Sequence, residues 1–389
     1  MDKSAADELV TLIQELVRIE SENPPGNERK VAEYIVDWFE TEGIDVELVH
    51  EPFEDRPQVV ATVGSGEPTV VLNGHMDVIE PGDRSKWTYP PYEATIEDGV
   101  MYGRGSVDMK SGLGVGMYTL KHLKQRLEAG ELEGTVMMQA VVGGEEAEPG
   151  TKTLVELGYT GDCAVVLEPT RMQTATSEKG TAWYRITVPG EPVHASRPEQ
   201  GINANDRVRT VMDHLDEYDS VLRKREDELV GKRFATVTQI NSSNESVSVL
   251  PDEVVLTLDR RILPDESVEE VDDDIAAQLE AIEQEHGFRP SWERLTTYHS
   301  GFADPESEIV TTLQEESWNM RKIDREPIGL IFSTDMSHFA ERDIDAVVWG
   351  PGDHQQAHTV DEQIPIEDIT DGFEILDRSL RRMLSRNPS

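Results

Sequence analysis

Residues 68–77 read PTVVLNGHMD, an apolar run that passes directly into a glycine, a histidine and an aspartate. A continuous run of valine and leucine is typical of a strand that helices bury on both faces. The runs at 135–141, 163–167 and 346–349 have the same character. A helical pattern at about 112–127 separates the first two strands, and this alternation predicts an α/β domain whose sheet is sandwiched between helices.

The middle of the chain has a different pattern, because residues 181–188 alternate between apolar and polar side chains, as in a strand with one solvated face. Further elements follow in β-α-β-β-α order, with helices near 203–225 and 268–284 and strands near 234–240 and 254–262. This order predicts an α+β domain inserted into the first one. The expected domains are a discontinuous one of residues 1–177 and 291–389 and an inserted one of residues 178–290.

Acidic residues dominate the composition. The chain of 389 residues has 78 Asp and Glu against 36 Lys and Arg, which gives a formal net charge of −42. Because phosphate binding needs concentrated basic side chains, this charge excludes a nucleic-acid partner and disfavours an anionic membrane surface. It favours a folded protein from a halophilic cytoplasm, where salt screens the repulsion, over an acidic protein from a cell with little salt.

Three features concern the compartment. No run of 18 apolar residues exists, so we expect no membrane span. Residues 1–8 are acidic and lack the apolar stretch of a signal peptide. The single cysteine, Cys163, has no partner for an internal disulfide, in keeping with a reducing environment. We therefore expect a cytoplasmic protein.

Histidines and acids gather at the ends of the predicted strands, in the glycine-rich loop 103–112 and near the C-terminus. These residues are His75, Asp77, Asp108, Glu145, Glu146, Glu168 and His358. Sites in open α/β sheets lie at the carboxyl ends of the strands, so we expect the strand-end side chains at one rim. Imidazole and carboxylate together form a mixed ligand set that suits Zn²⁺, Co²⁺ or Mn²⁺.

Each of these residues also has a plainer interpretation. A lone histidine at a strand end is more often a structural hydrogen-bonding group, and two consecutive glutamates in so acidic a chain are usually solvated. Asp108 could simply cap the helix that follows it. Their shared position after apolar or glycine-rich segments favours a metal site, at which one of two consecutive acids can bind metal while the other acts as a base.

Several motifs of the chain resemble those of a known family. The motifs are His75-Met76-Asp77, the loop 103–112, Glu145-Glu146 and Glu168-Pro169, and they occur in order over nearly the whole chain. They are similar to those of the co-catalytic zinc hydrolases, which include acetylornithine deacetylase, succinyl-diaminopimelate desuccinylase, carboxypeptidase G and aminoacylase. The resemblance implies a zinc-exopeptidase-like mixed sheet and two Zn²⁺ per subunit, with Co²⁺ or Mn²⁺ as alternatives.

The resemblance also implies a role for each residue. His75, Asp108 and Glu168 would hold one metal ion. Asp108 would bridge to a second ion, which Glu146 and His358 would also hold. Glu145 would be the general base, and Asp77 would orient His75. The resemblance further implies a cis peptide bond after Asp108.

The inserted domain resembles the family's dimerisation domain, which implies a homodimer. His194, in the segment 190–198, would stabilise the oxyanion in the partner subunit's site, and its plainer interpretation is a surface loop histidine. Arg261, in the segment 259–264, would bind a substrate carboxylate through its guanidinium fork, and its plainer interpretation is a surface ion pair.

These observations predict a metal-dependent amidohydrolase that acts on a small N-acyl amino acid. One alternative is a dipeptidase or aminopeptidase on the same scaffold, whose substrates carry a free α-amine. Another is a metal- or peptide-binding protein without catalytic activity, although metal storage alone has no need of a base such as Glu145. A third is that the acids are only a halophilic surface.

Overall fold

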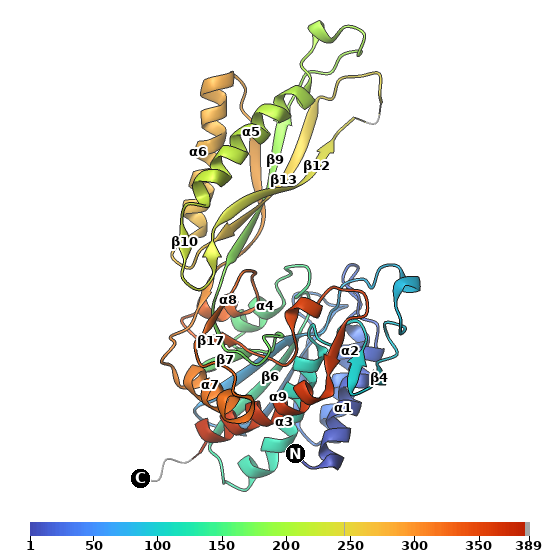
Figure 1. Ribbon diagram of the computed structural model, residues 1–389, viewed down its shortest axis with the longest axis vertical. Coiled ribbons are helices and arrows are strands. Elements are labelled where there is room, and N and C mark those ends of the chain that lie inside the picture. Colours follow the sequence, from blue (N-terminus) through green and yellow to red (C-terminus); the bar gives the residue numbers. More distant parts are fainter. Residues whose placement is uncertain (245, 386–389) are drawn as a thin grey trace. The chain divides into compact units, whose positions relative to one another are not determined.

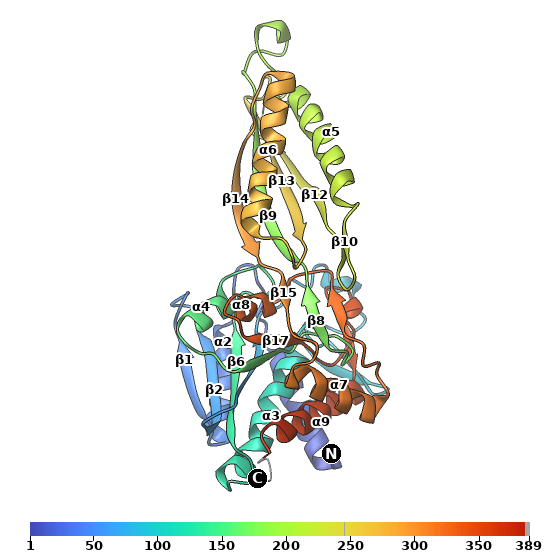
Figure 2. The same cartoon turned by 90° about the vertical axis from the view of Figure 1, so that its left-hand side faces the viewer.

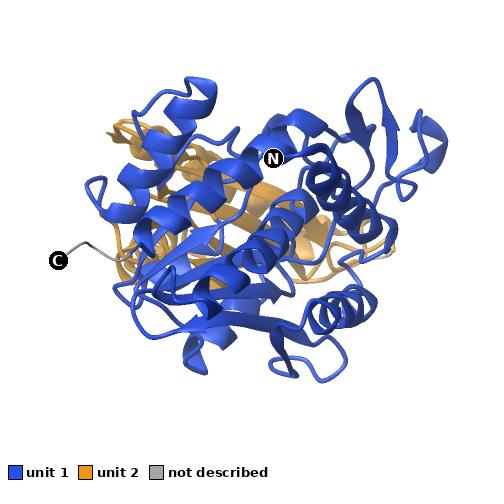
Figure 3. Ribbon diagram, turned by 90° about the horizontal axis from the view of Figure 1, so that it is seen from below, with its two compact units in different colours: residues 1–176, 302–328, 334–389 blue, residues 177–301, 329–333 orange. Residues whose placement is uncertain are grey.

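The structure, a computed structural model, describes residues 1–244 and 246–385. The path of the chain is drawn in Figures 1 and 2. Two compact units, coloured separately in Figure 3, divide it. The first unit consists of residues 1–176, 302–328 and 334–389, and the second consists of residues 177–301 and 329–333.

A mixed sheet forms the centre of the first unit. Its strands are ordered β1 (Asp45–Val49), β2 (Gln58–Ser65), β6 (Gly134–Val141), β3 (Thr69–His75), β7 (Cys163–Val166), β17 (Asp345–Val348), β8 (Ala175–Glu178) and β15 (Gly301–Phe302), and β16 (Ile328–Leu330) pairs with β8. β3 pairs in parallel with both β6 and β7, whereas β1, β2 and β6 pair antiparallel in that order. The α/β class and the mixed sheet are therefore confirmed.

Helices cover this sheet. They are α1 (Lys3–Arg18), α2 (Arg29–Thr41), α3 (Lys110–Glu128), α4 (Gly150–Glu156), α7 (Glu308–Arg321), α8 (Met336–Ala340) and α9 (Ile366–Met383). α3 packs on β2, β3 and β6 and contacts α1 and α9, beside which it runs in Figures 1 and 2. Its residues 110–120 are all buried because neighbours surround the helix on most sides. A small sheet of β4 (Thr95–Glu97), β5 (Val100–Tyr102) and β18 (Gln363–Pro365) lies beside the loop that precedes α3 in the chain.

The second unit has an antiparallel sheet and two long helices. The sheet is ordered β12 (Phe234–Ser242), β13 (Glu253–Ile262), β9 (Gly180–Pro189) and β14 (Ser291–Tyr298), the helices are α5 (Ala204–Leu222) and α6 (Val268–His286), and a small ribbon joins β10 (Glu226–Asp227) to β11 (Gly231–Lys232). β13 alternates strictly between buried and less buried residues. Its buried apolar side chains belong to one cluster with those of α5 and α6.

The predicted domain boundaries differ from the structural units, because residues 177, 291–301 and 329–333 all belong to the second unit. The sequence placed residues 291–301 in the first domain, but β14 pairs with β9 over the length of the strand and belongs to the second unit. β14 has one buried residue, so its pattern carries no signal for the sheet it joins.

In the described residues, no helix combines the length and the apolar character that crossing a bilayer requires.

Candidate metal centre

Three neighbouring parallel strands bring ligand-type side chains to one edge of the sheet. β3 ends at His75, β7 is followed within two residues by Glu168, and β6 leads into the loop that carries Glu145. Asp108 comes from the loop before α3. This convergence follows from parallel pairing, because the carboxyl ends of parallel strands meet at the same edge.

Asp108 faces two histidines with its two carboxylate oxygens. Oδ1 lies 3.4 Å from His75 Nε2, and Oδ2 lies 3.3 Å from His358 Nε2. Glu168 Oε1 is also 3.4 Å from His75 Nε2. If ligand atoms stand about 2.0–2.1 Å from a tetrahedral zinc ion, the edge of the tetrahedron is about 3.3–3.4 Å. The spacing and the mixed nitrogen and oxygen donors therefore fit two metal ions that share Asp108.

His75 is held by the residue two positions after it. Its Nδ1 lies 2.9 Å from the backbone carbonyl oxygen of Asp77, as a donor would, and 3.5 Å from the Asp77 carboxylate. The carboxylate itself accepts the backbone N–H groups of Gly144 and Glu145, at 3.1 Å each. A ring whose Nδ1 is bound in this way presents Nε2 to the metal. Asp77 thus joins His75 to the loop that carries Glu145.

The two consecutive glutamates have different environments. The Glu145 side chain is 6% exposed, and its Oε2 lies 2.9 Å from His358 Nε2. Oxygen and nitrogen atoms of His75, Asp108 and Glu145 lie within 4.8 Å of one another. Glu146 is exposed and is not part of this group among the described residues. The structure therefore brings Glu145 to the centre, whereas the role of Glu146 as a ligand stays a prediction.

A glycine allows the loop of Glu145 to lie against His75. A Cβ atom on Gly144 would stand 2.5 Å from two carbon atoms of the His75 ring. Any side chain at this position would push the loop away from the histidine, and the Glu145 carboxylate with it.

The peptide bond between Asp108 and Met109 is cis, which confirms the cis bond expected after Asp108.

The charges of the centre perturb one another strongly. Burial alone would raise the pKa of Asp108, but the hydrogen bonds from His358 and His75 hold it below its usual range. Asp108, and then Glu145, raise the pKa of His358 to about 10. Burial, followed by repulsion from Asp108, raises the pKa of Glu168 to about 7 and also raises that of Glu145. Protons on His358 and Glu168 thus offset part of the negative charge of this cluster, a task that divalent cations can take over.

Further residues, which the sequence analysis did not identify, hold the loops of the candidate centre. Asn23 donates to Asp77 (3.0 Å) and to Glu148 (2.9 Å), and Arg56 pairs with Glu148, so the loop after Glu145 is tied down from two sides. Glu362 binds the loop that carries Asp108. Among so many acids, no local pattern could have marked Glu148 or Glu362, since their roles depend on partners far away in the chain.

The two residues predicted in the inserted domain lie in the second unit. His194 is exposed, and its Nδ1 accepts a hydrogen bond from the backbone N–H of Ser196 at 3.1 Å. Arg261 is half-buried and holds Asp259 with Nε and Nη2, at 2.9 and 3.0 Å. Each side chain thus has a local partner within its own unit.

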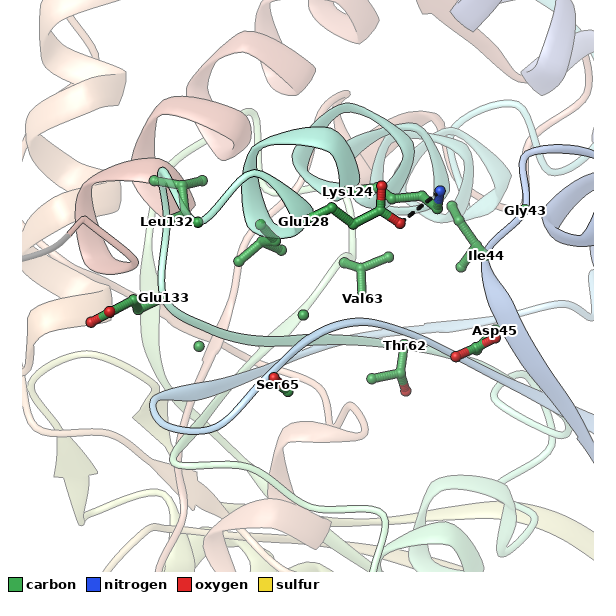
Figure 4. A pocket seen from close by; sticks show the side chains of 14 residues that line it. Gly43, Ile44, Asp45, Thr62, Val63, Ser65, Lys124, Glu128, Leu132 and Glu133 are labelled. Carbon is green, nitrogen blue, oxygen red and sulfur yellow. Dashed lines mark ion pairs between the residues drawn. The ribbon is translucent and has the colours of Figure 1, made fainter.

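A surface cavity of about 570 Å³ lies elsewhere in the first unit (Figure 4). Residues of β2, α3 and the start of β6 line it, and Lys124 and Glu128 form an ion pair of 2.9 Å along its wall. None of the seven strand-end and loop residues of the candidate centre lines this cavity.

Comparison with known proteins gives a consistent result. The pattern described as "Peptidase family M20/M25/M40" matches residues 71–382. The chain is 29% identical over 387 residues to a "probable succinyl-diaminopimelate desuccinylase" of Staphylococcus aureus strain N315, with 92% of this chain and 93% of that protein covered.

Solved structures agree on the fold. An M20 family metallo-carboxypeptidase from Sulfolobus solfataricus superposes with a TM-score of 0.79 at 19% identity, over 98% of this chain and 99% of that one. A protein of Bacillus subtilis described as a dinuclear metal binding peptidase from the M20 family superposes with a TM-score of 0.71 at 16% identity, over 98% and 99% of the two chains.

Proposed function

Because the chain belongs to peptidase family M20/M25/M40, which makes it a hydrolytic enzyme that acts on amides, we propose that it cleaves the amide bond of a small N-acyl amino acid. The proposal includes two metal ions per subunit, zinc by preference, with Co²⁺ or Mn²⁺ as substitutes. The observation that carries it is the placement of Asp108, whose two oxygens face His75 and His358 at 3.4 and 3.3 Å.

Each metal position has its own residues. His75, Asp108 and Glu168 would hold one ion, and Asp108, His358 and Glu146 the other. Ions bound there would act as Lewis acids on the amide carbonyl and lower the pKa of the attacking water. The protein supplies the geometry, since Asp77 and Gly144 together fix His75 and the neighbouring loop.

Glu145 is the proposed general base. It takes a proton from the attacking water and returns it to the leaving amine. Burial, and then the charge of Asp108, raise the pKa of Glu145, which makes it a better proton acceptor than an exposed glutamate. Its side chain lies among those of His75, Asp108 and His358, so it reaches the place where the water would be activated.

The name of the Staphylococcus aureus relative supports an N-acyl amino acid as substrate. Such a substrate carries a carboxylate, for which Arg261 is the proposed anchor. Asp259 binds the Nε and Nη2 edge of its guanidinium, which leaves the Nη1 edge for a ligand. His194 is the proposed oxyanion donor and acts across a homodimer formed by the second unit. The cytoplasm is the proposed compartment.

The test is a substrate panel with zinc-loaded protein at high salt. It compares N-acetyl and N-succinyl amino acids with free dipeptides, and chelator-treated protein is the control. We expect hydrolysis of an acylated amino acid with at least a tenfold higher kcat/KM than that of any dipeptide. Cleavage of dipeptides alone would replace the deacylase with a dipeptidase, and activity that survives chelation would contradict the metal mechanism.

A further inference from the structure

We propose that Glu362 is a positioning residue of the metal centre, whose carboxylate fixes the loop 105–108 so that Asp108 faces both histidines. The inference rests on the proposed function, because it concerns how the chain holds its metal ligands. Glu362 is completely buried, and both of its oxygens are engaged. Within the described residues, the hydrogen bond that joins it to a predicted ligand comes from the backbone N–H of Asp108.

Four donors converge on this carboxylate. Oε1 accepts the backbone N–H groups of Val107 (2.9 Å) and Asp108 (3.1 Å). Oε2 accepts the backbone N–H of Gly105 (3.1 Å) and a guanidinium N–H of Arg104. The acceptor atoms thus hold the N–H groups of three of the four residues 105–108, which leaves the backbone before Asp108 little freedom to turn.

The same contacts set the spacing between Asp108 and His358, which lies four residues before Glu362 in the chain. Arg104 Nη2 donates to the carbonyl oxygen of Thr359 (3.3 Å), and the Gly103 N–H donates to the carbonyl oxygen of Glu362 (2.9 Å). β5 and β18 continue the pairing immediately beyond. The segment that carries His358 and the loop that carries Asp108 are therefore joined along their length, with Glu362 at the junction.

The chemistry of the junction requires a carboxylate. A carboxylate only accepts hydrogen bonds, whereas the amide of a glutamine would direct an NH₂ group at two donors in either orientation. Two N–H groups would then lose their acceptor in a buried place, and the guanidinium of Arg104 would lose its counter-charge. The loop would shift to relieve this, and Asp108 would shift with it.

The experiment compares Glu362→Gln with Glu266→Gln as a matched control. Glu266 is also a buried carboxylate, with a side chain 6% exposed that accepts from Arg260 (3.0 Å), from Arg233 and from the backbone N–H of Leu263 (2.9 Å). It belongs to the second unit, whereas all five predicted metal ligands belong to the first. Both substitutions should therefore lower the unfolding temperature, which a purely structural role explains.

Metal binding separates the two variants. Full-length, metal-free protein is titrated with Zn²⁺ by calorimetry and with Co²⁺ by visible absorption, at one salt concentration. We expect Glu362→Gln to lower the affinity for at least one metal ion about 10–100-fold, the usual effect of losing a group that orients a ligand. We also expect the variant to change the Co²⁺ spectrum. Glu266→Gln should bind both ions as the wild type does. Unchanged dissociation constants in Glu362→Gln, or equal losses in both variants, would overturn the inference.

Arg104→Lys keeps the test decisive if Glu362→Gln does not fold. A lysine retains the counter-charge of Glu362 but loses the guanidinium contact with Thr359, so metal affinity should fall severalfold. An unchanged affinity in this variant would overturn the inference. Wild-type protein that binds no divalent ion would instead contradict the proposed function, so the two failures are distinguishable.

Discussion

Asp108 is the residue on which the candidate centre depends, because one carboxylate serves two histidines that are 283 positions apart in the chain, at 75 and 358. The two consecutive glutamates near it have different surroundings. Glu145 is enclosed with Asp108 and His358, whereas Glu146 faces solvent. At the scale of single residues, the useful experiments are those that separate a ligand from a base.

Glu145→Gln should retain both metal ions and lose at least ~100-fold in kcat, the lower end for general acid–base catalysis. The amide keeps the volume of the side chain but cannot accept the proton of water. Metal content by elemental analysis and turnover of the best substrate are the two measurements. Loss of a metal ion from this variant, with normal content in Glu146→Gln, would make Glu145 a ligand rather than the base.

Metal affinity should rise with pH. At pH values below about 10, His358 is protonated in the metal-free protein, and below about 7 Glu168 is protonated as well. A metal ion must displace these protons, so its apparent affinity falls as the pH falls. Zinc titrations between pH 6 and 8.5, in two buffers of different ionisation enthalpy, measure the affinity and the protons released. Binding without proton release would show that the histidines are neutral before metal arrives.

At the scale of elements, the contact between α3 and the end of β7 brings Asp108 close to Glu168. A Cβ atom on Gly112 would stand 2.0 Å from the carbonyl oxygen of Leu167, the residue before Glu168. At Gly116, one turn along, a Cβ would meet the ends of the Leu167 and Met138 side chains, at 2.7 and 2.8 Å. A backbone atom cannot move aside as the end of a side chain can. We therefore expect a larger residue to be tolerated less well at position 112 than at position 116.

Gly112→Ala should therefore destabilise the protein by roughly 1–3 kcal/mol, the cost of overpacking, despite the better helix propensity of alanine. Gly116→Ala is the matched control and should cost less, since flexible side chains can move. Urea unfolding of both variants with saturating zinc measures the difference. Equal stability of the two alanine variants would show that α3 can move away from β7 without loss.

At the scale of the whole molecule, the formal charge of −42 sets the conditions under which the fold persists. In about 0.01 M salt the Debye length is near 30 Å, so acids across the protein repel one another, whereas at 1 M it is about 3 Å. Bound cations offset this repulsion only at the metal centre. We expect mobile ions to screen the repulsion between the remaining acids.

Thermal stability and activity should thus rise steeply as KCl increases into the molar range. The measurement is thermal unfolding at several KCl concentrations with excess zinc throughout, so that metal loss does not contribute. A matched series in sucrose controls for effects of cosolute that do not involve charge. A melting temperature that stays flat between 0.1 and 2 M KCl would contradict the halophilic interpretation.

The sequence by itself determined the class of the fold and predicted the residues of the candidate site. Apolar runs such as 68–73 mark buried strands, and the residues that follow them, among them His75 and Glu168, converge because parallel strands end at one edge. These are local signals, since hydrophobic pattern and strand end lie within a few residues of each other.

Only the tertiary structure decided which neighbours each side chain has. β14 joins the second sheet through a partner more than 100 positions earlier in the chain, and its own pattern shows no sign of that choice. Glu362 binds the N–H of Asp108 across 254 positions, and Glu145 rather than Glu146 turns towards His358. The residue type alone does not distinguish these cases, because packing of distant segments determines whether a carboxylate meets a metal site, a backbone N–H or water.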